Sequence, residues 1–513
     1  MRVRQFDVAV AGAGPVGMTA AALLVRLGLE VVVVERNATT SDAPKAISVD
    51  DEALRVYQWA GLGERVLGII VPGTGTRYYD AAGRPVFQAR AARPYRFGYP
   101  FKNPFAQPDL ERELMAHLRE VATVRMGTEL LGFTQDAGGV ELKCGDGSLL
   151  RARYLLGCDG GRSTVREHLG VGMTGRSHQD VWLVADVLDD PHDERYGMHH
   201  GDPARPHVVV PGRDGRCRYE FLLHPGEGAA GVPPSFSLVR SLLAPFRPIE
   251  PGQVERAVNY RFNAVVANEW RKDKTFLLGD AAHMMPPFAG QGLNSGIRDA
   301  GNLAWKIADV LAGRLDESAL DSYETERRPH AEATVRLSEK LGRVVMTTNA
   351  AFAARRDRLI DRALGTPAGR GYLEEMRYRP PQHYRSGLVT DGGGAVVGQP
   401  RVFDTGQHRT TMFDDAVGEG WALLGVDVEL ADYPAATALT QSLSPSVVHV
   451  ATEDRLPARA GRAFVDVDGG LDTEFAGYRG RFVLLRPDRF VAASWRPGDS
   501  PDLFWTAERK ALS

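Results

Sequence analysis

Cysteine is scarce in this chain. Only three of the 513 residues are cysteines, Cys144, Cys158 and Cys217, and no two of them form a Cys-x-x-Cys pair. This scarcity disfavours a disulfide framework, a redox dithiol and a structural zinc site. We therefore predict no metal site, and the cysteine usage is typical of a reducing, cytoplasmic compartment.

Long hydrophobic runs and blocks of one charge are lacking as well. No segment reaches the ~20 uninterrupted apolar residues of a membrane span. The apolar run VAVAGAGPVGMTAAALLV is broken by Gly-Ala-Gly-Pro and leads into a strand pattern, so we do not interpret it as a signal peptide. The 62 Lys and Arg residues are matched by 65 Asp and Glu. The sequence therefore predicts neither a membrane nor a nucleic-acid partner.

A nucleotide-binding motif stands at the N-terminus. Residues 6–11 read as a strand, residues 15–27 as a helix and residues 30–34 as a second strand. The first turn carries Gly12-x-Gly14-x-x-Gly17, in which the glycines allow a tight turn, close approach of a pyrophosphate and close helix packing. Glu35 ends the second strand, where a carboxylate can accept hydrogen bonds from a ribose. This motif fits NAD and FAD equally well.

Two further segments repeat the order strand, acid, glycines, helix. One is RYLLGCDGGRSTVREHLG, in which Asp159 follows the strand, and the other is TFLLGDAAHMMPPFAGQGLNSGIRDAGNLAWK, in which Asp280 does. An acid in this place suits a polyol or ribityl chain. A helix that begins near Gly292 would direct backbone N–H groups towards negative charge. No second complete Gly-x-Gly-x-x-Gly motif occurs, and GGGAVVG at 392–398 is interpreted as a loop.

These three motifs together resemble the class A, single-component FAD aromatic hydroxylases over nearly the whole chain. Within that family, PKAISVDDEALR, YETERRPHA and LLRPDRFVAASW are most similar to the branch that acts on 3-(3-hydroxyphenyl)propionate. The resemblance implies an α/β fold. It would combine a Rossmann-like FAD-binding domain of the GR2 type, an inserted antiparallel-sheet substrate domain and a C-terminal thioredoxin-like α/β domain. The FAD ligands that it implies are Gly12, Ala13, Gly14, Pro15, Val16, Gly17, Glu35, Arg36, Lys45, Gln107, Asp159, Asp280, Pro287, Gly290, Gln291, Gly292, Leu293 and Asn294.

The family also implies a reaction. NADH or NADPH would reduce FAD, O2 would add to form a flavin C4a-hydroperoxide, and a phenolic ring would be hydroxylated ortho or para to its hydroxyl. A hydroxyphenylpropionate-like phenolic acid is the expected substrate. Lys45 departs from the family, which usually has Arg at this position. Lysine keeps the charge but loses the planar fork of guanidinium.

The substrate domain is expected at 181–269, with parts of 70–110. In RCRYEFLLHPGE the side chains of Cys217, Tyr219, Phe221 and Leu223 alternate with Arg216, Arg218 and Glu220. The candidate catalytic residues are His283, Pro287, His207 and Tyr219. His283 could equally pack against the cofactor loop, and Tyr219 could equally be a core residue. For His207, as for His199 and His200, an exposed or hydrogen-bonded loop histidine is the favoured interpretation, while the resemblance implies that Pro287 presents its carbonyl near the flavin edge. Arg218 is a guess for a residue that binds a substrate carboxylate.

The remaining domain boundaries follow from the motifs, from the Pro- and Gly-rich stretch at 377–400 and from the family resemblance, which implies the thioredoxin-like domain. We expect the FAD-binding domain at 1–180 plus 270–345, a helical region and linker at 346–395, and the thioredoxin-like domain at 396–513. Because this last domain contains no cysteine, it cannot exchange disulfides, and a structural or oligomerisation role is expected. Two other functions stay open, a tailoring hydroxylase of a polycyclic polyketide and a non-catalytic flavin-fold protein. A small aromatic molecule is the expected partner, and a homodimer stays open.

Overall fold

The computed structural model describes residues 5–90, 93–452, 461–501 and 503. They form two compact units. Unit 1 comprises the chain up to Tyr95, Tyr99–Ala300 and Ala331–Pro380, and unit 2 comprises Arg96–Gly98, Gly301–His330 and the chain from Pro381 on. Within these ranges, no helix combines the length and the apolar character that crossing a membrane requires.

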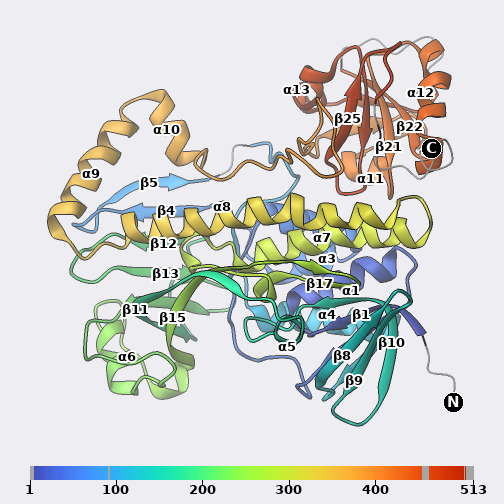
Figure 1. Cartoon of the computed structure of the whole chain (residues 1–513). Coiled ribbons are helices and arrows are strands. Elements are labelled where there is room, and N and C mark those ends of the chain that lie inside the picture. Colours follow the sequence, from blue (N-terminus) through green and yellow to red (C-terminus); the bar gives the residue numbers. More distant parts are fainter. Residues whose placement is uncertain (1–4, 91–92, 453–460, 502, 504–513) are drawn as a thin grey trace. The chain divides into compact units, whose positions relative to one another are not determined.

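Unit 1 contains a largely parallel sheet built around the predicted N-terminal motif (Figure 1). Its strand order is β16-β17-β10-β1-β2-β7, with the β8–β9 hairpin attached to β10. The bounds are β1 Gln5–Ala11, β2 Val31–Glu35, β7 Thr123–Met126, β8 Leu130–Asp136, β9 Gly139–Cys144, β10 Leu149–Gly157, β16 Arg271–Lys272 and β17 Thr275–Leu277. The motif is confirmed as β1, helix α1 (Pro15–Arg26) and β2, within two residues of the predicted ends. Its apolar residues are buried because a parallel sheet is covered on both faces.

A second sheet of unit 1 has the order β18-β15-β11-β14-β13-β12-β4-β5. The bounds are β4 Thr76–Tyr79, β5 Pro85–Ala89, β11 Met173–Val187, β12 Gly197–His200, β13 His207–Pro211, β14 Cys217–Leu222, β15 Val254–Ala267 and β18 His283–Met284. The alternation expected in β14 is confirmed, since Cys217, Tyr219 and Phe221 belong to one buried apolar cluster. The pairing is antiparallel except between β12 and β4, which run parallel.

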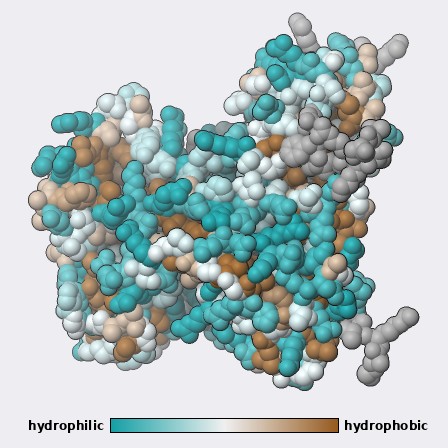
Figure 2. Space-filling view, in the orientation of Figure 1, coloured by the Kyte–Doolittle hydropathy of each residue, from teal (hydrophilic) through white to brown (hydrophobic). Residues whose placement is uncertain are grey.

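The other elements of unit 1 are mostly helices. Their bounds are α2 Asp51–Trp59, α3 Gly63–Ile69, α4 Gln107–Val121, α5 Thr164–His168, α6 Phe236–Leu243, α9 Ala350–Leu364 and α10 Pro367–Glu374, with the two-stranded ribbon β3 Ser48–Val49 and β6 Asn103–Pro104. Two long helices, α7 (Gly292–Leu311) and α8 (Ser322–Val345), contribute residues to both units. Hydrophilic residues cover most of the face drawn in Figure 2.

Unit 2 contains a mixed sheet with the order β20-β19-β23-β22-β21-β24-β25. Strands β21, β22 and β23 are parallel, and β24 and β25 are antiparallel additions at one side. The bounds are β19 Arg401–Asp404, β20 Arg409–Met412, α11 Phe413–Val417, β21 Ala422–Val426, α12 Tyr433–Leu439, β22 Ser446–Ala451, β23 Ala463–Asp466, α13 Gly470–Phe475, β24 Arg481–Leu485 and β25 Val491–Trp495. This is the expected C-terminal α/β arrangement.

A buried ion cluster explains why residues 301–330 group with the C-terminal part. Both carboxylate oxygens of Glu326 lie 2.8 Å from the guanidinium of Arg486, and Nζ of Lys306 lies 2.7 Å from Glu326 Oε2. All three side chains are completely buried. The predicted end of the FAD-binding domain lies at 345 instead, and the domain boundaries stay predictions.

Candidate functional site

A cavity of about 380 Å³ lies in unit 1, where the glycine-rich turns of the parallel-sheet part meet one face of the second sheet. Eleven of the predicted cofactor residues line it: Gly14, Pro15, Val16, Lys45, Gln107, Asp280, Pro287, Gly290, Gln291, Gly292 and Leu293. They come from four separate stretches of the chain. The fold therefore brings together residues that the sequence could only place in separate motifs.

The turn between β1 and α1 has the backbone that a close ligand requires. Gly12 has a φ of 104°, and a Cβ on it would lie 2.5 Å from the carbonyl oxygen of Cys158. A Cβ on Gly17 would lie 2.1 Å from the carbonyl oxygen of Gly12. At Gly14, by contrast, the space is open, and no side chain caps the helix that begins there. The N–H groups of α1 are thus free to bind phosphate.

Glu35 and its neighbours lie behind this turn. Glu35 Oε2 accepts a hydrogen bond from the N–H of Ala13 at 2.9 Å, and Oε1 accepts one from the N–H of Asn37 at 2.9 Å. Arg36 follows β2 and is exposed. Glu35 is thus oriented at the end of β2, beside the first glycine turn.

Two carboxyl groups have the surroundings of ligand-binding groups. Asp159 Oδ2 accepts a hydrogen bond from the N–H of Val165 at 3.0 Å, whereas Oδ1 is buried without a hydrogen-bond partner among the described residues. Asp280 opens into the cavity, and loss of hydration raises its pKa, an effect that His283 and Lys45 oppose. Polyol hydroxyls in the cavity could bond to Asp280, whereas Asp159 lies beside the lining residues Cys158 and Gly160 without lining the cavity itself. These residues therefore fit an FAD at this place.

The loop before α7 is held rigidly from behind. Gly290 has a φ of 63°, a left-handed conformation that glycine adopts easily. Asn294 is completely buried, and its Nδ2 donates to the carbonyl oxygens of Gly290 at 2.7 Å and Ser48 at 3.1 Å. Its Oδ1 accepts a hydrogen bond from the N–H of Asp50 at 3.0 Å. We call residues 287–294 the ring-side loop.

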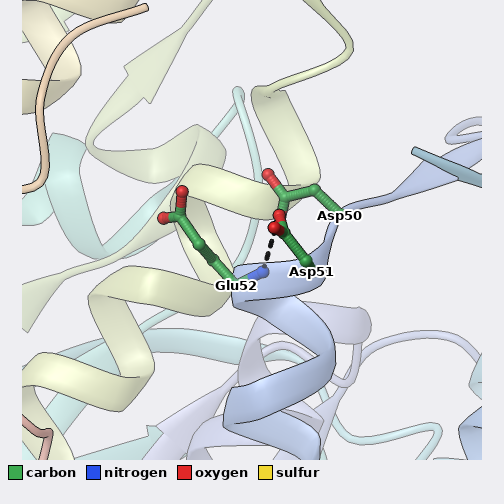
Figure 3. A group of neighbouring side chains, drawn as sticks. All are labelled: Asp50, Asp51 and Glu52. Atoms are coloured by element: carbon green, nitrogen blue, oxygen red, sulfur yellow. Dashed lines mark hydrogen bonds between the residues drawn. The ribbon is translucent and has the colours of Figure 1, made fainter. Parts of the chain in front are cut away.

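The support of this loop is a group of three acids at the start of α2, Asp50, Asp51 and Glu52 (Figure 3). Asp50 Oδ2 lies 3.0 Å from Nε2 of Gln291 and 3.0 Å from Nη1 of Arg298. Burial would raise the pKa of Asp50, but the charges of Arg298 and Arg379 hold it below its usual value. Burial and the charges of Asp50 and Glu52 raise the pKa of Asp51 to about 8.

Arg218, which the sequence analysis suggested as a ligand for a substrate carboxylate, already forms an ion pair and hydrogen bonds within the protein. Its Nε lies 2.6 Å from Asp186 Oδ1, and its Nη1 donates to the carbonyl oxygen of Lys45 at 2.7 Å. Its Nη2 donates to the carbonyl oxygen of Pro44, which also accepts a hydrogen bond from Arg256. Although Arg218 lines the cavity, its hydrogen bonds fix the backbone of the Pro44–Lys45 segment.

The second sheet and the segment before β6 contribute polar groups that the sequence did not single out for the site. Lys102, Thr76 and Glu220 line the cavity together with His199, which the sequence suggested only as a loop histidine. Burial, with the charges of Lys102 and His200, lowers the pKa of His199 to about 3. Burial raises the pKa of Glu220, an effect that Arg218 opposes.

His283 is enclosed rather than open to the cavity. Its Nε2 lies 2.7 Å from Asp299 Oδ2, its ring stacks on Trp270 and no part of it is exposed. Two roles were open for His283, packing against the cofactor loop and contact with the substrate. The buried position agrees with packing against the loop.

Of the remaining catalytic candidates, Tyr219 belongs to the buried apolar cluster of the second sheet, and His207 packs against aromatic residues beside it. His207 stacks on His200 at 4.3 Å between ring centroids and has Phe246 at its edge. The hydroxyl of Tyr219 donates to Asp190 at 3.0 Å, and burial raises the pKa of Tyr219. The position of Tyr219 matches its structural alternative as a core residue. The expectation of loop histidines is wrong, because His199 and His200 lie on β12 and His207 begins β13, while Pro287 lines the cavity.

Two protein families match the chain. The family described as FAD binding domain matches residues 5–338, and the HcaD C-terminal domain matches residues 394–510. Curated relatives match nearly the whole length. A 3-(3-hydroxy-phenyl)propionate/3-hydroxycinnamic acid hydroxylase of Mycobacterium sp. (strain KMS) is 37% identical over 97% of this chain and 90% of that protein. A hydroxylase of the same name, numbered 2, from Burkholderia vietnamiensis is 35% identical over 95% of this chain and 93% of its own length.

Solved structures share the fold. The flavin-dependent monooxygenase PieE, solved with FAD and substrate, has a TM-score of 0.79 with 22% identity and covers 96% of each chain. Aklavinone-11 hydroxylase, solved with FAD and aklavinone, has a TM-score of 0.77 with 24% identity, over 100% of this chain and 98% of that one.

Proposed function

We propose that the substrate of this chain is a hydroxyphenylpropionate-like phenolic acid. The premise is that the chain belongs to the FAD-dependent aromatic hydroxylases. The ring would be hydroxylated ortho or para to its hydroxyl, with NADH or NADPH as reductant and O2 as the source of the oxygen atom. One observation carries this proposal. A single cavity is bordered by backbone-rich loops that fit FAD and by a wall of side chains that fits a small polar aromatic.

The bound FAD would supply the redox chemistry, accepting a hydride from the nicotinamide and passing one oxygen atom of O2 to the ring. The chain supplies binding and orientation. The N–H groups at the start of α1 would bind the phosphates, and Asp280 would accept hydrogen bonds from the ribityl hydroxyls. The start of α7 would favour negative charge on the ring system by ~0.3–1 kcal/mol.

Apolar side chains on the same cavity would exclude water from the reacting ring. Val208 and Val210 come from β13, and Phe288 comes from the ring-side loop. Phe288 is itself fixed by an edge contact with Trp182, at 5.4 Å between ring centroids. A dry wall of this kind strengthens the electrostatic interactions inside it.

The polycyclic alternative rests on a different observation. Aklavinone-11 hydroxylase, solved with a polycyclic ligand, shares the fold over the whole chain. Sequence identity favours the phenolic acid, because the hydroxyphenylpropionate hydroxylases are 35–37% identical over at least 95% of the chain, against 24% for that structure. We therefore place the polycyclic substrate second.

A substrate panel tests the function. We expect the purified protein to be yellow, and its oxidation of NADH or NADPH to rise at least about tenfold when 3-(3-hydroxyphenyl)propionate is added, with a dihydroxylated product found by mass spectrometry. The matched control is 3-phenylpropionate, which lacks the hydroxyl and should give no product. Hydroxylation of an anthracyclinone-type ring instead would favour the second candidate. Failure of every aromatic in the panel would refute both.

A further inference from the structure

We propose that Lys102 takes the proton from the phenolic hydroxyl of the substrate and holds the resulting phenolate beside the ring-side loop. This inference rests on the proposed function and names the group that ionises the substrate. Lys102 belongs to the cavity wall opposite the glycine-rich turns. None of the sequence motifs described above includes this lysine.

Lys102 lies where the second sheet meets the ring-side loop. Its Nζ donates to the hydroxyl of Thr76, on β4, at 3.2 Å. Its Cε is 3.8 Å, and its Nζ 4.0 Å, from the point where a Cβ on Gly290 would lie. The backbone of Lys102 is left-handed, with a φ of 53°. Its amine is thus directed into the cavity and faces both the substrate wall and the loop that fits the flavin ring.

The charges around Lys102 suit a proton acceptor. Burial, reinforced by the positive charge of Arg379, lowers the pKa of Lys102 to about 8, while Asp50 acts in the opposite direction. His199 faces it from β12 and is neutral at pH 7, because its own pKa lies at about 3. A lysine whose pKa lies near the working pH can both accept a proton and bind the anion that it creates.

The other titratable groups of this wall are poorer acceptors. His199 is too weak a base. Arg218 is bonded to Asp186 and to two carbonyl oxygens of the Pro44–Lys45 segment. The carboxyl group of Glu220 is buried with Oε1 3.9 Å from Nη1 of Arg218, so its charge is directed at that guanidinium.

The position also favours the phenolic hydroxyl over the substrate carboxylate. Oxygen is added ortho or para to the hydroxyl, and an ortho carbon is bonded to the carbon that carries it. For addition at an ortho carbon the hydroxyl therefore lies next to the reacting position, on the side of the ring-side loop that the Lys102 amine approaches, whereas a carboxylate at the end of a propionate chain extends away from the reacting carbon.

The proton balance is simple. The lone pair of the Lys102 amine forms an N–H bond as the phenolic O–H bond breaks, which gives an ammonium and a phenolate. The phenolate's electron pair raises the electron density of the ortho and para carbons that receive oxygen. After oxygen has been added, the C–H bond of the receiving carbon breaks, its electron pair restores the aromatic ring and its proton leaves to solvent. The Lys102 ammonium then returns its proton to the original phenolic oxygen, which restores the amine.

A titration of the bound substrate tests this without turnover. The FAD-loaded protein is mixed with 3-(3-hydroxyphenyl)propionate in the absence of NADH and NADPH, and the phenolate absorption is followed against pH. A free phenol has a pKa of about 10, and an adjacent ammonium should lower it by about 1–3 units. In K102M we expect no such lowering and a kcat lower by at least about 100-fold. K143M, which removes an exposed lysine of β9, should behave like the wild type.

Each outcome decides the matter. A wild-type protein whose bound phenol titrates at the free value overturns the proposal whether or not K102M folds, and so does an unchanged shift in folded K102M. If K102M weakens binding of 3-phenylpropionate as much as that of the phenol, Lys102 binds the carboxylate and the proposal is wrong. If the wild type neither binds nor hydroxylates any phenol, the proposed function itself has failed. Product formation without a shift in phenol pKa rejects only the role of Lys102.

Discussion

The two walls of the cavity are built on different principles. On the side of the glycine-rich turns, shape decides. Gly12, Gly14 and Gly290 allow the backbone to approach a ligand closely. The polar groups that support this backbone, such as those of Asn294, are mostly hydrogen-bonded within the protein. On the side of the second sheet, polar side chains line the cavity, and burial lowers the pKa of Lys102 to about 8 and that of His199 to about 3. A cofactor common to a family can be held by backbone, whereas a particular substrate requires particular side chains.

Replacing Asp50 should have the largest effect, because it removes the buried charge on which the ring-side loop rests. Asp50→Asn would remove the carboxylate that lies 3.0 Å from Nη1 of Arg298, a side chain only 7% exposed, and would leave Glu52, at 3.2 Å, as its remaining carboxylate partner. Breaking a buried ion pair from one side costs about 3–5 kcal/mol. We expect a loss of that order in the free energy of unfolding, measured with urea, and weaker FAD retention. An effect below about 1 kcal/mol would mean that the loop does not depend on this charge.

A pair of glycine variants tests whether shape governs the first wall. Gly17→Ala should destabilise the protein by about 1–3 kcal/mol, because its Cβ would overlap the carbonyl oxygen of Gly12. Gly14→Ala meets no neighbouring atom and should fold normally, yet it should bind FAD roughly tenfold more weakly, a difference of about 1.4 kcal/mol. The measurements are thermal unfolding and FAD titration of the apoprotein. Equal stability of the two variants would contradict this reading of the turn.

At pH 5 the smallest effect should come from Asp51, which borders Asp50 and whose pKa, unlike that of Asp50, is raised overall, chiefly by burial. Its pKa is raised from 3.8 to about 8, so the folded state keeps its proton while the unfolded state loses it. This residue therefore lowers stability progressively as pH rises from about 4 to about 8. Asp51→Asn, which mimics the protonated carboxyl, should remove that slope. At pH 5, which is 1.2 pH units above 3.8, the variant should be more stable than the wild type by about 1.6 kcal/mol. Urea unfolding at several pH values measures it, and a slope unchanged by the substitution would count against the raised pKa.

The same contrast explains how far the sequence could predict the molecule. Strand β1, helix α1 and strand β2 could be predicted within two residues because hydrophobic periodicity and glycine spacing are local signals. Lys102 could not be placed in the site, because its neighbours Thr76 and Gly290 come from distant parts of the sequence. His199 reaches the same place only through the pairing of β12 with β4, across more than a hundred residues. The enclosure of His283 likewise depends on Asp299 and Trp270, and the sequence pattern specifies neither contact.

The ion cluster of Glu326, Lys306 and Arg486 limits how this chain can be recombined. Lys306 and Glu326 come from the middle of the sequence, and Arg486 directly follows β24, yet all three side chains are completely buried and contact one another. A chimaera that exchanged only the C-terminal segment with a relative would have to reproduce an arginine matched to this glutamate. The C-terminal segment therefore cannot be exchanged alone. The segments of α7 and α8 that carry Lys306 and Glu326 must be exchanged together with it.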